Sequence, residues 1–361
     1  MRRFSPARSI RLMPKVVIIG GGIAGLSLAA ELAGQAEVVV LEREAHPGMH
    51  ATGRSAALFV ENYGNSAIRT LNRASRSGLQ PYLKQRGVLF VASAEEQDAL
   101  DGHLAESAGM VEISVQKALG HFPILNGARF SRAAYEEDAS DIDVDALMGQ
   151  HRRSLRASVG RIATRTEVIA LSPSRNGWDV VTADRTYRAD IVVNAAGAWA
   201  DEVAQLAGIT PLGLTPLRRS AAILPAPGGH DVSRWPMALS ASETWYAKPE
   251  AGRLMVSPAE EDPVAPMDAW PDDMVLAEGL DRYAQAVTEP VTRVERSWAG
   301  LRTFAPDRTP VLGWGASGFF WCAGQGGYGV QTSPEMARLA AQAILHDSDL
   351  PAELDVARFL N

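Results

Sequence analysis

Residues 15–42 read KVVIIGGGIAGLSLAAELAGQAEVVVLE, and this stretch decides the fold class. The apolar run Val16–Ile19 predicts a buried strand, and the alanine- and leucine-rich segment after the glycines predicts a helix that Gly34 would end. A second apolar run, Val38–Leu41, leads to Glu42. The stretch therefore predicts a strand–helix–strand unit, the repeating element of an α/β domain with a doubly wound sheet.

The glycines between the first strand and the helix indicate a site for an adenine dinucleotide. Gly20, Gly22 and Gly25 stand in G-x-G-x-x-G spacing. Gly20 would make the tight turn, Gly22 would let the backbone approach a pyrophosphate, and Gly25 would let the helix pack closely on the strand. The helix N-terminus attracts phosphate, and Glu42, twenty residues after Gly22, is placed to accept hydrogen bonds from a ribose.

A secretory signal peptide is the competing interpretation of the N-terminal region. The basic residues that precede the apolar stretch are Arg2, Arg3, Arg8 and Arg11. However, three consecutive glycines would weaken the helix of a signal peptide, and that interpretation leaves the second strand and Glu42 unexplained. We therefore favour the dinucleotide site and expect residues 1–13 to form a mobile tail.

Composition and charge bound the class of protein. The chain has 361 residues, enough for two domains, and its 46% hydrophobic and 21% charged content is typical of a soluble globular protein. A net charge of −7 argues against nucleic-acid binding. The single cysteine, Cys322, excludes an intrachain disulfide and a multi-cysteine metal site, and it fits a cytoplasmic location. No metal site is predicted.

Later segments supply further pieces of the doubly wound domain. Residues 162–187 predict short strands with a turn at 174–177, and residues 190–197 predict a buried strand that runs into a second glycine turn. Residues 199–208 predict a helix. Near the C-terminus, an apolar strand at 318–323 opens into the glycine-rich run 324–329.

A capping pattern follows this glycine-rich run. Thr332 and Glu335 have the spacing of a capping box, and Pro334 suits a first helical turn, so the pattern predicts a helix that begins at Thr332 and continues to His346. Residues 14–87, 140–215 and 291–361 would form the cofactor domain. Residues 88–139 and 216–290, with strand-like runs and acidic loops, would form a second, inserted domain.

With these pieces in order, the chain resembles the flavin-dependent D-amino acid oxidase superfamily, and within it the bacterial D-arginine dehydrogenase branch. The motifs that carry the resemblance are GGGIAG with Glu42, HATGRSAA (50–57), EEDASDIDVDAL (136–147), VVNAAGAWAD (192–201), WAGLRTFAPD (298–307) and GQGGYGVQTS (324–333). The resemblance implies a Rossmann-like FAD-binding domain with an inserted antiparallel-sheet substrate domain. It also implies noncovalent FAD, because Gly300 stands where some relatives attach the flavin through a cysteine.

The resemblance assigns cofactor roles by position. Gly20, Gly22 and Gly25 would take the pyrophosphate, Glu42 the ribose, and Arg43 and Val168 the adenine. The residues expected on the flavin side are Thr52, Gly53, Arg54, Ser55 and Ala56. Ala196 and Gly197 are expected over the pyrophosphate. The residues expected at the pyrimidine end of the ring are Gly329, Val330, Gln331 and Thr332. A helix N-terminus at the pyrimidine end would stabilise the negative charge of the reduced ring.

The resemblance also assigns the substrate site. Arg219 and Arg302 would hold the substrate carboxylate, Tyr63 and Tyr246 would close the pocket, and the carbonyl of Gly327 would accept a hydrogen bond from the amine. Other interpretations remain open, because arginines are often solvated and tyrosines often pack in a core. One of the adjacent Arg218 and Arg219 is expected to face solvent. His50 is expected to pack or hydrogen-bond, and Cys322 to be buried and inert.

The chain departs from the D-arginine dehydrogenase pattern at the pocket wall. Leu58 and Val60 stand where a histidine and a threonine are expected, and the acid that would pair with a cationic side chain is missing near Lys84–Arg86. These departures favour a neutral or apolar side chain over D-arginine, or an acidic one paired with Lys84 or Arg86. Met255 stands where several oxidases carry a lysine that activates O₂, which favours a quinone or another acceptor over oxygen.

The predicted activity is therefore oxidation of a D-amino acid to an imino acid, which water converts to a 2-oxo acid and ammonia. The alternatives are a secondary amine, opine or 2-hydroxy acid substrate, or an electron-transfer flavoprotein subunit of a larger complex. The predicted partners are a small amino acid and an electron acceptor. Peripheral contact with a membrane and the oligomeric state stay open.

Overall fold

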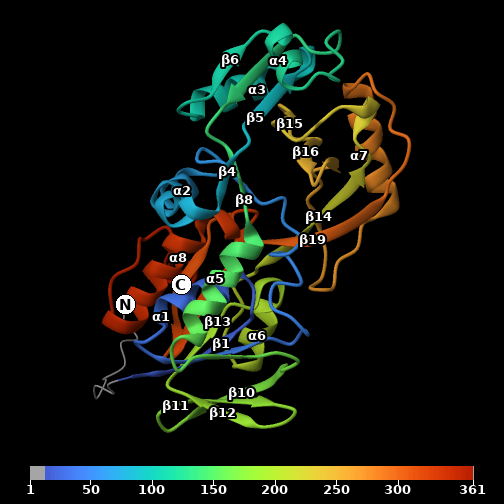
Figure 1. The fold of residues 1–361 in the computed structure, drawn as a ribbon. Coiled ribbons are helices and arrows are strands. Elements are labelled where there is room, and N and C mark those ends of the chain that lie inside the picture. The colour runs from blue at the N-terminus through green and yellow to red at the C-terminus, as the bar shows by residue number, and fades with distance from the viewer. Residues whose placement is uncertain (1–12, 361) are drawn as a thin grey trace.

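The computed structural model describes residues 13–360. The predicted mobile tail, residues 1–13, lies outside the described residues apart from Met13. Two large sheets organise the chain and lie in the lower and upper parts of Figure 1. No helix within residues 13–360 has both the length and the apolar character needed to cross a membrane.

The first sheet has six strands in the order β20-β21-β13-β1-β2-β9. The parallel strands are β1 (Lys15–Ile19), β2 (Glu37–Leu41), β9 (Arg161–Ala163), β13 (Ile191–Asn194) and β21 (Phe319–Ala323), and β20 (Val311–Ala316) is an antiparallel edge strand. The apolar runs form strands here because both faces of a parallel sheet are covered. Val16 and Ile18 pack on one face, and Val17 and Ile19 pack on the other.

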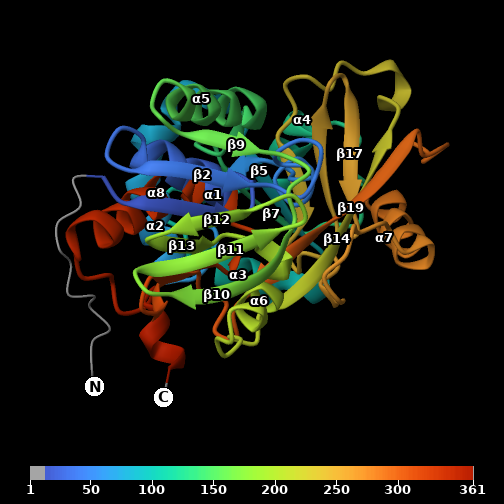
Figure 2. The same cartoon turned by 90° about the horizontal axis from the view of Figure 1, so that it is seen from below.

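Different layers cover the two faces of this sheet. One face carries α1 (Ile23–Leu32), α2 (Ser66–Leu79), α5 (Val144–Arg156) and α8 (Gly329–His346). The other face carries α6 (Ala200–Leu206) and a three-stranded sheet of β10 (Val168–Ser174), β11 (Gly177–Thr182) and β12 (Thr186–Ala189), as Figure 2 shows. The predicted short strands and the helix after the second glycine turn are thereby confirmed.

The second sheet has ten strands and is mostly antiparallel. Its order is β22-β19-β14-β17-β16-β15-β5-β7-β6, and β18 pairs with β14. The strands are β5 (Val88–Ala92), β6 (Val111–Ile113), β7 (Arg132–Glu136), β14 (Thr215–Leu224), β15 (Met237–Ser240), β16 (Tyr246–Glu250), β17 (Arg253–Ser257), β18 (Asp262–Pro263), β19 (Arg296–Phe304) and β22 (Gln325–Gly326). Helices α4 (Val115–His121) and α7 (Asp273–Ala286) pack on one face, and α3 (Gln97–Glu106) packs on the other.

Short elements join the two sheets. Strands β3 (Leu58–Phe59), β4 (Leu83–Gln85) and β8 (Ser140–Ile142) form a small sheet between them. Single-turn 3₁₀ helices lie at Gln80–Tyr82, Ala94–Glu96, Gly197–Trp199, Pro227–Gly229 and Val356–Phe359. The architecture confirms the predicted α/β fold class. Strand β19, which the sequence grouped with the cofactor segments, pairs along its length with β14 in the second sheet.

The predicted start of the last helix is wrong. Helix α8 begins at Gly329 with Tyr328 as its N-cap, three residues before Thr332, and Pro334 lies inside it. Proline leaves the carbonyl of Val330 without its usual helical donor, and the hydroxyl of Ser333 donates to that carbonyl at 2.9 Å instead. The hydroxyl of Thr332 donates to the carbonyl of Tyr328 at 2.9 Å, so Thr332 does not cap the helix.

Candidate active site

One continuous cavity runs from the carboxyl ends of the parallel strands to the second sheet. At one end it is lined by Glu42, Arg43 and Val168, and at the other by Tyr246, Met255 and Arg302. Between them lie the glycine turn after β1, the loop 48–56, the turn after β13 and the start of α8. Ligands of doubly wound folds bind outside the carboxyl ends of the strands, so this cavity has the expected position of a cofactor site.

Close packing explains two of the three motif glycines. A Cβ atom on Gly20 would lie 2.3 Å from the carbonyl oxygen of Ala195, and φ of Gly20 is +109°. A Cβ atom on Gly25 would lie 2.0 Å from the carbonyl oxygen of Gly20, so Gly25 sets helix α1 against the turn and does not line the cavity. Gly22 is the N-cap of α1 and lines the cavity. The amide of Ile23 donates to the hydroxyl of Thr52 at 3.0 Å, and the rest of the helix N-terminus can face an anion.

Backbone N–H groups hold Glu42 in place. The amide of Gly21 donates to Oε2 at 2.9 Å, and the amide of Glu44 donates to Oε1 at 2.8 Å. The side chain is buried, yet Glu42 lines the cavity. The carboxylate therefore orders the glycine turn and keeps lone pairs available for a hydroxyl ligand.

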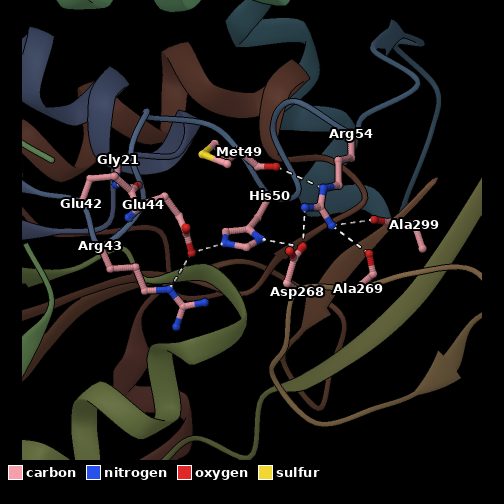
Figure 3. Close-up of polar contacts among 10 residues, drawn as sticks. All are labelled: Gly21, Glu42, Arg43, Glu44, Met49, His50, Arg54, Asp268, Ala269 and Ala299. Atoms are coloured by element: carbon pink, nitrogen blue, oxygen red, sulfur yellow. Dashed lines mark hydrogen bonds and ion pairs between the residues drawn. The ribbon is translucent and has the colours of Figure 1, made fainter. Parts of the chain in front are cut away.

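A polar cluster joins the loop after β2 to the second sheet (Figure 3). Arg54 pairs with Asp268 and donates to the carbonyls of Met49, Ala269 and Ala299 at 3.1, 2.9 and 3.0 Å. This ion pair and hydrogen bond lower the pKa of Asp268. Arg54 thus fastens β19 and the segment around Asp268 to the cavity wall.

His50 extends the same cluster toward the adenine end of the cavity. Its Nε2 lies 2.9 Å from Oε1 of Glu44, and this hydrogen bond lowers the pKa of Glu44. Its Nδ1 lies 3.8 Å from Asp268. Arg43 hydrogen-bonds with Glu44 at 3.1 Å and stacks 3.7 Å over the ring of Trp199. The expectation that His50 packs and hydrogen-bonds is confirmed.

The two predicted carboxylate-binding arginines lie on one face of the second sheet. Arg219 of β14 pairs in register with Gly300, and Arg302 of β19 pairs with Leu217, so the two guanidinium groups are diagonal neighbours. Arg218 points to the opposite face, where it pairs with Asp262 at 3.1 Å and Asp272 at 3.6 Å. The side chain of Arg218 is only 13% exposed, so the expectation that one of the two arginines faces solvent is wrong, although they do point to opposite faces of the sheet.

The surroundings of the two guanidinium groups differ. Arg219 donates to the carbonyl of Glu260 at 2.9 Å and to Glu261 at 3.2 Å, while burial and the nearby charge of Arg302 lower its pKa. Arg302 hydrogen-bonds with Tyr63, and among the described residues no carboxylate forms an ion pair with it. Burial lowers the pKa of Arg302, but Tyr63, Tyr246 and Glu261 outweigh it and the net shift is upward. Arg302 lines the cavity and forms no ion pair among the described residues, so its guanidinium group is available to an anion.

The other predicted substrate residues surround this charge. Tyr246 lines the cavity, and Tyr63 packs edge-on against Tyr328, with ring centroids 5.0 Å apart. A Cβ atom on Gly327 would lie 3.1 to 3.2 Å from the guanidinium of Arg302, so a larger side chain would press on that group. Met255 lines the cavity as expected.

Most of the predicted cofactor residues line the cavity, and some do not. Those that line it are Gly20, Gly22, Glu42, Arg43, Thr52, Arg54, Ser55, Ala56, Val168, Ala196, Gly197, Gly329 and Val330. Gly25, Gly53, Gln331 and Thr332 do not line it. Because α8 starts earlier than predicted, Gln331 and Thr332 are buried inside the first turns, and Gln331 accepts a hydrogen bond from the amide of Val60 at 3.1 Å.

The predicted pairing of Lys84 or Arg86 with an acidic substrate is wrong. Neither residue lines the cavity. Arg86 donates to Asp141 at 2.7 Å and to the carbonyls of Ser233 and Trp235 at 2.7 and 3.0 Å. Its guanidinium group therefore holds the chain together and is not available to a ligand.

Cys322 is buried in β21, as expected. Burial raises the pKa of its thiol to about 12, so the thiolate is scarce at neutral pH and the side chain is inert. Sequence reasoning missed Asp268, which no motif marked. It also missed Glu136, although alternation in β7 puts Glu136 on the same face as the apolar Ala134, and both are buried.

The cavity fits a flavin dinucleotide from end to end. It has an acid for a ribose, an open helix N-terminus beside a glycine turn for a pyrophosphate, and a second helix N-terminus at Gly329 beside the sheet face that carries Arg302. Residues 15–343 match the family described as FAD dependent oxidoreductase (DAO). The chain belongs to this family. FAD is therefore its cofactor.

Several known proteins are similar to this DAO family member over almost its whole length. The glycine oxidase of Geobacillus kaustophilus is 24% identical, over 91% of this chain and 92% of the relative. A crystal structure of glycine oxidase from Geobacillus kaustophilus has a TM-score of 0.80 at 23% identity, and it covers 96% of this chain and 98% of its own. A crystal structure of L-proline dehydrogenase from P. horikoshii has a TM-score of 0.80 at 22% identity, and it covers 95% and 96%. These likenesses confirm the DAO fold.

Proposed function

We propose that this DAO family member oxidises a D-amino acid with a neutral or apolar side chain. The substrate loses a hydride from Cα and a proton from its amine to become an imino acid, and water converts the imino acid to a 2-oxo acid and ammonia. FAD, when bound, supplies the acceptor for the hydride. A cytoplasmic location and a quinone or similar final acceptor belong to this proposal.

The observation that carries the proposal is that the guanidinium group of Arg302 lines the cavity and forms no ion pair within residues 13–360. A cationic side chain that faces a cavity without a carboxylate partner favours an anionic ligand, and a planar guanidinium matches a carboxylate in two parallel hydrogen bonds. Arg219 lies diagonally beside it and adds charge, although Glu261 already engages part of that group. The arrangement supports an α-carboxylate as the group that is bound.

The remaining residues would orient the rest of the substrate. The carbonyl of Gly327 would accept a hydrogen bond from the amine, and the hydroxyls of Tyr63 and Tyr246 would close the pocket around it. Fixing the carboxylate and the amine together leaves Cα little freedom, and such positioning supplies much of the rate enhancement in reactions of this kind. A neutral amine is required for the hydride to leave, so the rate should rise with pH as the ammonium group loses its proton.

The apolar wall supports a neutral or apolar side chain. Ala221 and Met255 line the cavity beside the arginines. Among the described residues, no acid near Lys84–Arg86 lines this cavity, so none there could pair with a cationic side chain in it. A second candidate is oxidation of glycine or a cyclic secondary amine. The names of two similar proteins, glycine oxidase and L-proline dehydrogenase, favour it.

Anaerobic bleaching of the bound flavin tests these candidates on one preparation. D-leucine, D-phenylalanine, D-arginine, their L-forms, glycine, L-proline and 2-hydroxy acids are added separately, and the loss of visible flavin absorption is timed. We expect D-leucine or D-phenylalanine to bleach the flavin faster than D-arginine or any L-form. Preference for glycine or L-proline would support the second candidate. Bleaching by no amine would point to an electron-transfer subunit.

A further inference from the structure

A second cavity, about 670 Å³ in volume, adjoins the candidate active site. Arg219 lines both cavities, and Tyr63, which lines the second, hydrogen-bonds with Arg302 in the first. An amino acid whose carboxylate is held at the two arginines therefore lies where the cavities meet. Its side chain can extend into the second cavity, which has the volume usual for small-molecule sites.

A buried carboxyl group faces this second cavity without a full set of partners. Glu136 lines the cavity and is only 3% exposed. The amide of Asn62 donates to Oε1 at 3.1 Å, and among residues 13–360 nothing donates to Oε2. A buried polar atom without a partner is costly, and such atoms in native proteins usually meet a ligand or water.

Salt bridges offset most of the charge on the other residues of this cavity. Arg69 pairs with Glu106, while Arg219 and Arg308 pair with Glu261, and both of these acids also line the cavity. A ligand group that reaches Glu136 therefore meets a site of little net charge, which favours a neutral group. The other walls near Glu136 include the apolar Val60, Phe90 and Met110. Burial is the largest influence on Glu136, ahead of the hydrogen bond from Asn62, and it raises the pKa of the carboxyl to about 7.

We propose that the second cavity is the side-chain subsite of the enzyme and that Glu136 selects D-amino acids whose side chain ends in a neutral hydrogen-bond donor, such as an amide. This inference rests on the proposed function and narrows it. Glu136 accepts the hydrogen bond from the side-chain N–H, and Val60, Phe90 and Met110 enclose the apolar stem. A substrate of equal shape without the donor leaves Oε2 of Glu136 unpaired.

Three substrates of nearly equal shape test the proposal on the unmodified holoenzyme. D-asparagine carries a donor, D-leucine carries none, and D-aspartate carries a negative charge. The expected order of kcat/KM is D-asparagine, then D-leucine, then D-aspartate, with about 10- to 100-fold between the first two, because D-leucine leaves a buried acceptor of Glu136 unpaired. Equal turnover of D-asparagine and D-leucine would overturn the proposal.

Variants then connect the preference to Glu136. Glu136→Leu should lower the D-asparagine to D-leucine ratio by about 10- to 100-fold. Its fold should survive, because the amide of Asn62 keeps the carbonyl of Ala108 at 2.8 Å as an acceptor. Glu136→Gln keeps the shape and one acceptor oxygen, so it should retain most of the ratio. Glu243→Leu is the matched control, because Glu243 lines the same cavity but is exposed, and its ratio should stay unchanged.

The outcomes separate this inference from the proposed function. If D-amino acids bleach the flavin but Glu136→Leu keeps the wild-type ratio, the inference fails and the proposed function stands. If no D-amino acid bleaches the flavin of the wild-type protein, both fail. A fall in the ratio with Glu136→Leu and not with Glu243→Leu supports the subsite.

Discussion

Replacement of Arg302 by methionine should separate activity from stability. Arg302 contributes a positive charge that forms no ion pair with a described carboxylate, and it lies diagonally beside the like charge of Arg219. Methionine has a similar length and removes the charge. The variant should therefore lose its grip on a substrate carboxylate, while the folded protein loses a repulsion and a buried charge.

The effects of Arg302→Met on kcat/KM and on the free energy of unfolding have opposite signs and different sizes. Truncation of one partner of a buried charged pair costs about 2–5 kcal/mol, so kcat/KM for the best D-amino acid should fall by about 30- to 5,000-fold. The free energy of unfolding should stay unchanged or rise by about 1 kcal/mol, because the lost contacts with Tyr63 and Glu261 are offset by relief of the repulsion from Arg219 and of the cost of burying the charge. A site built for a ligand typically shows this trade-off.

The assay pairs flavin reduction with thermal unfolding of the same preparations. Arg218→Met is the matched control, because Arg218 is the sequence neighbour of Arg219 but pairs with Asp262 and Asp272 on the opposite face of the sheet. The control should lose up to about 1 kcal/mol of stability and keep kcat/KM within about threefold. The reasoning would be refuted if Arg302→Met kept near-wild-type kcat/KM, or if it unfolded several degrees below the control.

Three further changes test the cofactor site. Glu42→Ala removes the carboxylate that accepts hydrogen bonds from the amides of Gly21 and Glu44. The Kd for FAD, measured by fluorescence titration, should therefore rise about 10-fold or more, and the order of preferred substrates should stay unchanged. An unaltered FAD affinity would contradict this role of Glu42. Asp268→Asn removes the ion pair with Arg54 but leaves the backbone carbonyls to which Arg54 donates. FAD should therefore dissociate a few-fold faster in a stopped-flow release assay. An unchanged rate would argue against a role of this ion pair in holding FAD. Met255→Lys places an ammonium group at a position that lines the cavity. Hydrogen peroxide release should become faster, because the ammonium group stabilises O₂ as it gains negative charge. No increase would argue against residue 255 as the position at which a lysine activates O₂.

Local patterns in the sequence predict the first sheet well because its strands are continuous apolar runs. Val16–Ile19 and Val38–Leu41 form β1 and β2 with the turn and helix between them as expected. The glycine motif predicts more than secondary structure, because Gly20 and Gly25 are required by backbone contacts of 2.3 and 2.0 Å. Here local spacing and tertiary packing impose the same requirement.

The start of α8 illustrates where local patterns fail. Thr332, Pro334 and Glu335 have the composition of a helix start, but the helix begins at Gly329. The hydroxyl of Ser333 replaces the missing donor at Pro334, and this compensation depends on a rotamer that sequence spacing does not reveal. The shift matters for function, because it brings Gly329 and Val330 to the cavity and buries Gln331 and Thr332.

The arginines of the candidate site could be named from the sequence only through family resemblance. A strand position fixes which face a side chain occupies once the register is known. The register of β14 with β19 pairs residues that lie from 73 (Ile223 with Arg296) to 89 (Thr215 with Phe304) positions apart. Asp268 reaches Arg54 across a separation of 214 residues, so no local pattern could reveal that ion pair. The sequence shows Glu136 as an acid at the end of an alternating strand, but it does not show that Oε2 of Glu136 lacks a hydrogen-bond donor among the described residues.

The two cavities suggest why the catalytic and selective parts of this protein can change separately. The first cavity lies between the parallel strands and β14, β16, β17 and β19, where Arg219, Arg302, Tyr246 and Gly327 would act on the backbone atoms of an amino acid. The second is formed partly by α3, β5 and β7, which contribute only to side-chain contacts. A substitution such as Glu136→Leu therefore changes which side chain is accepted while Arg302 and the glycine turn keep their contacts.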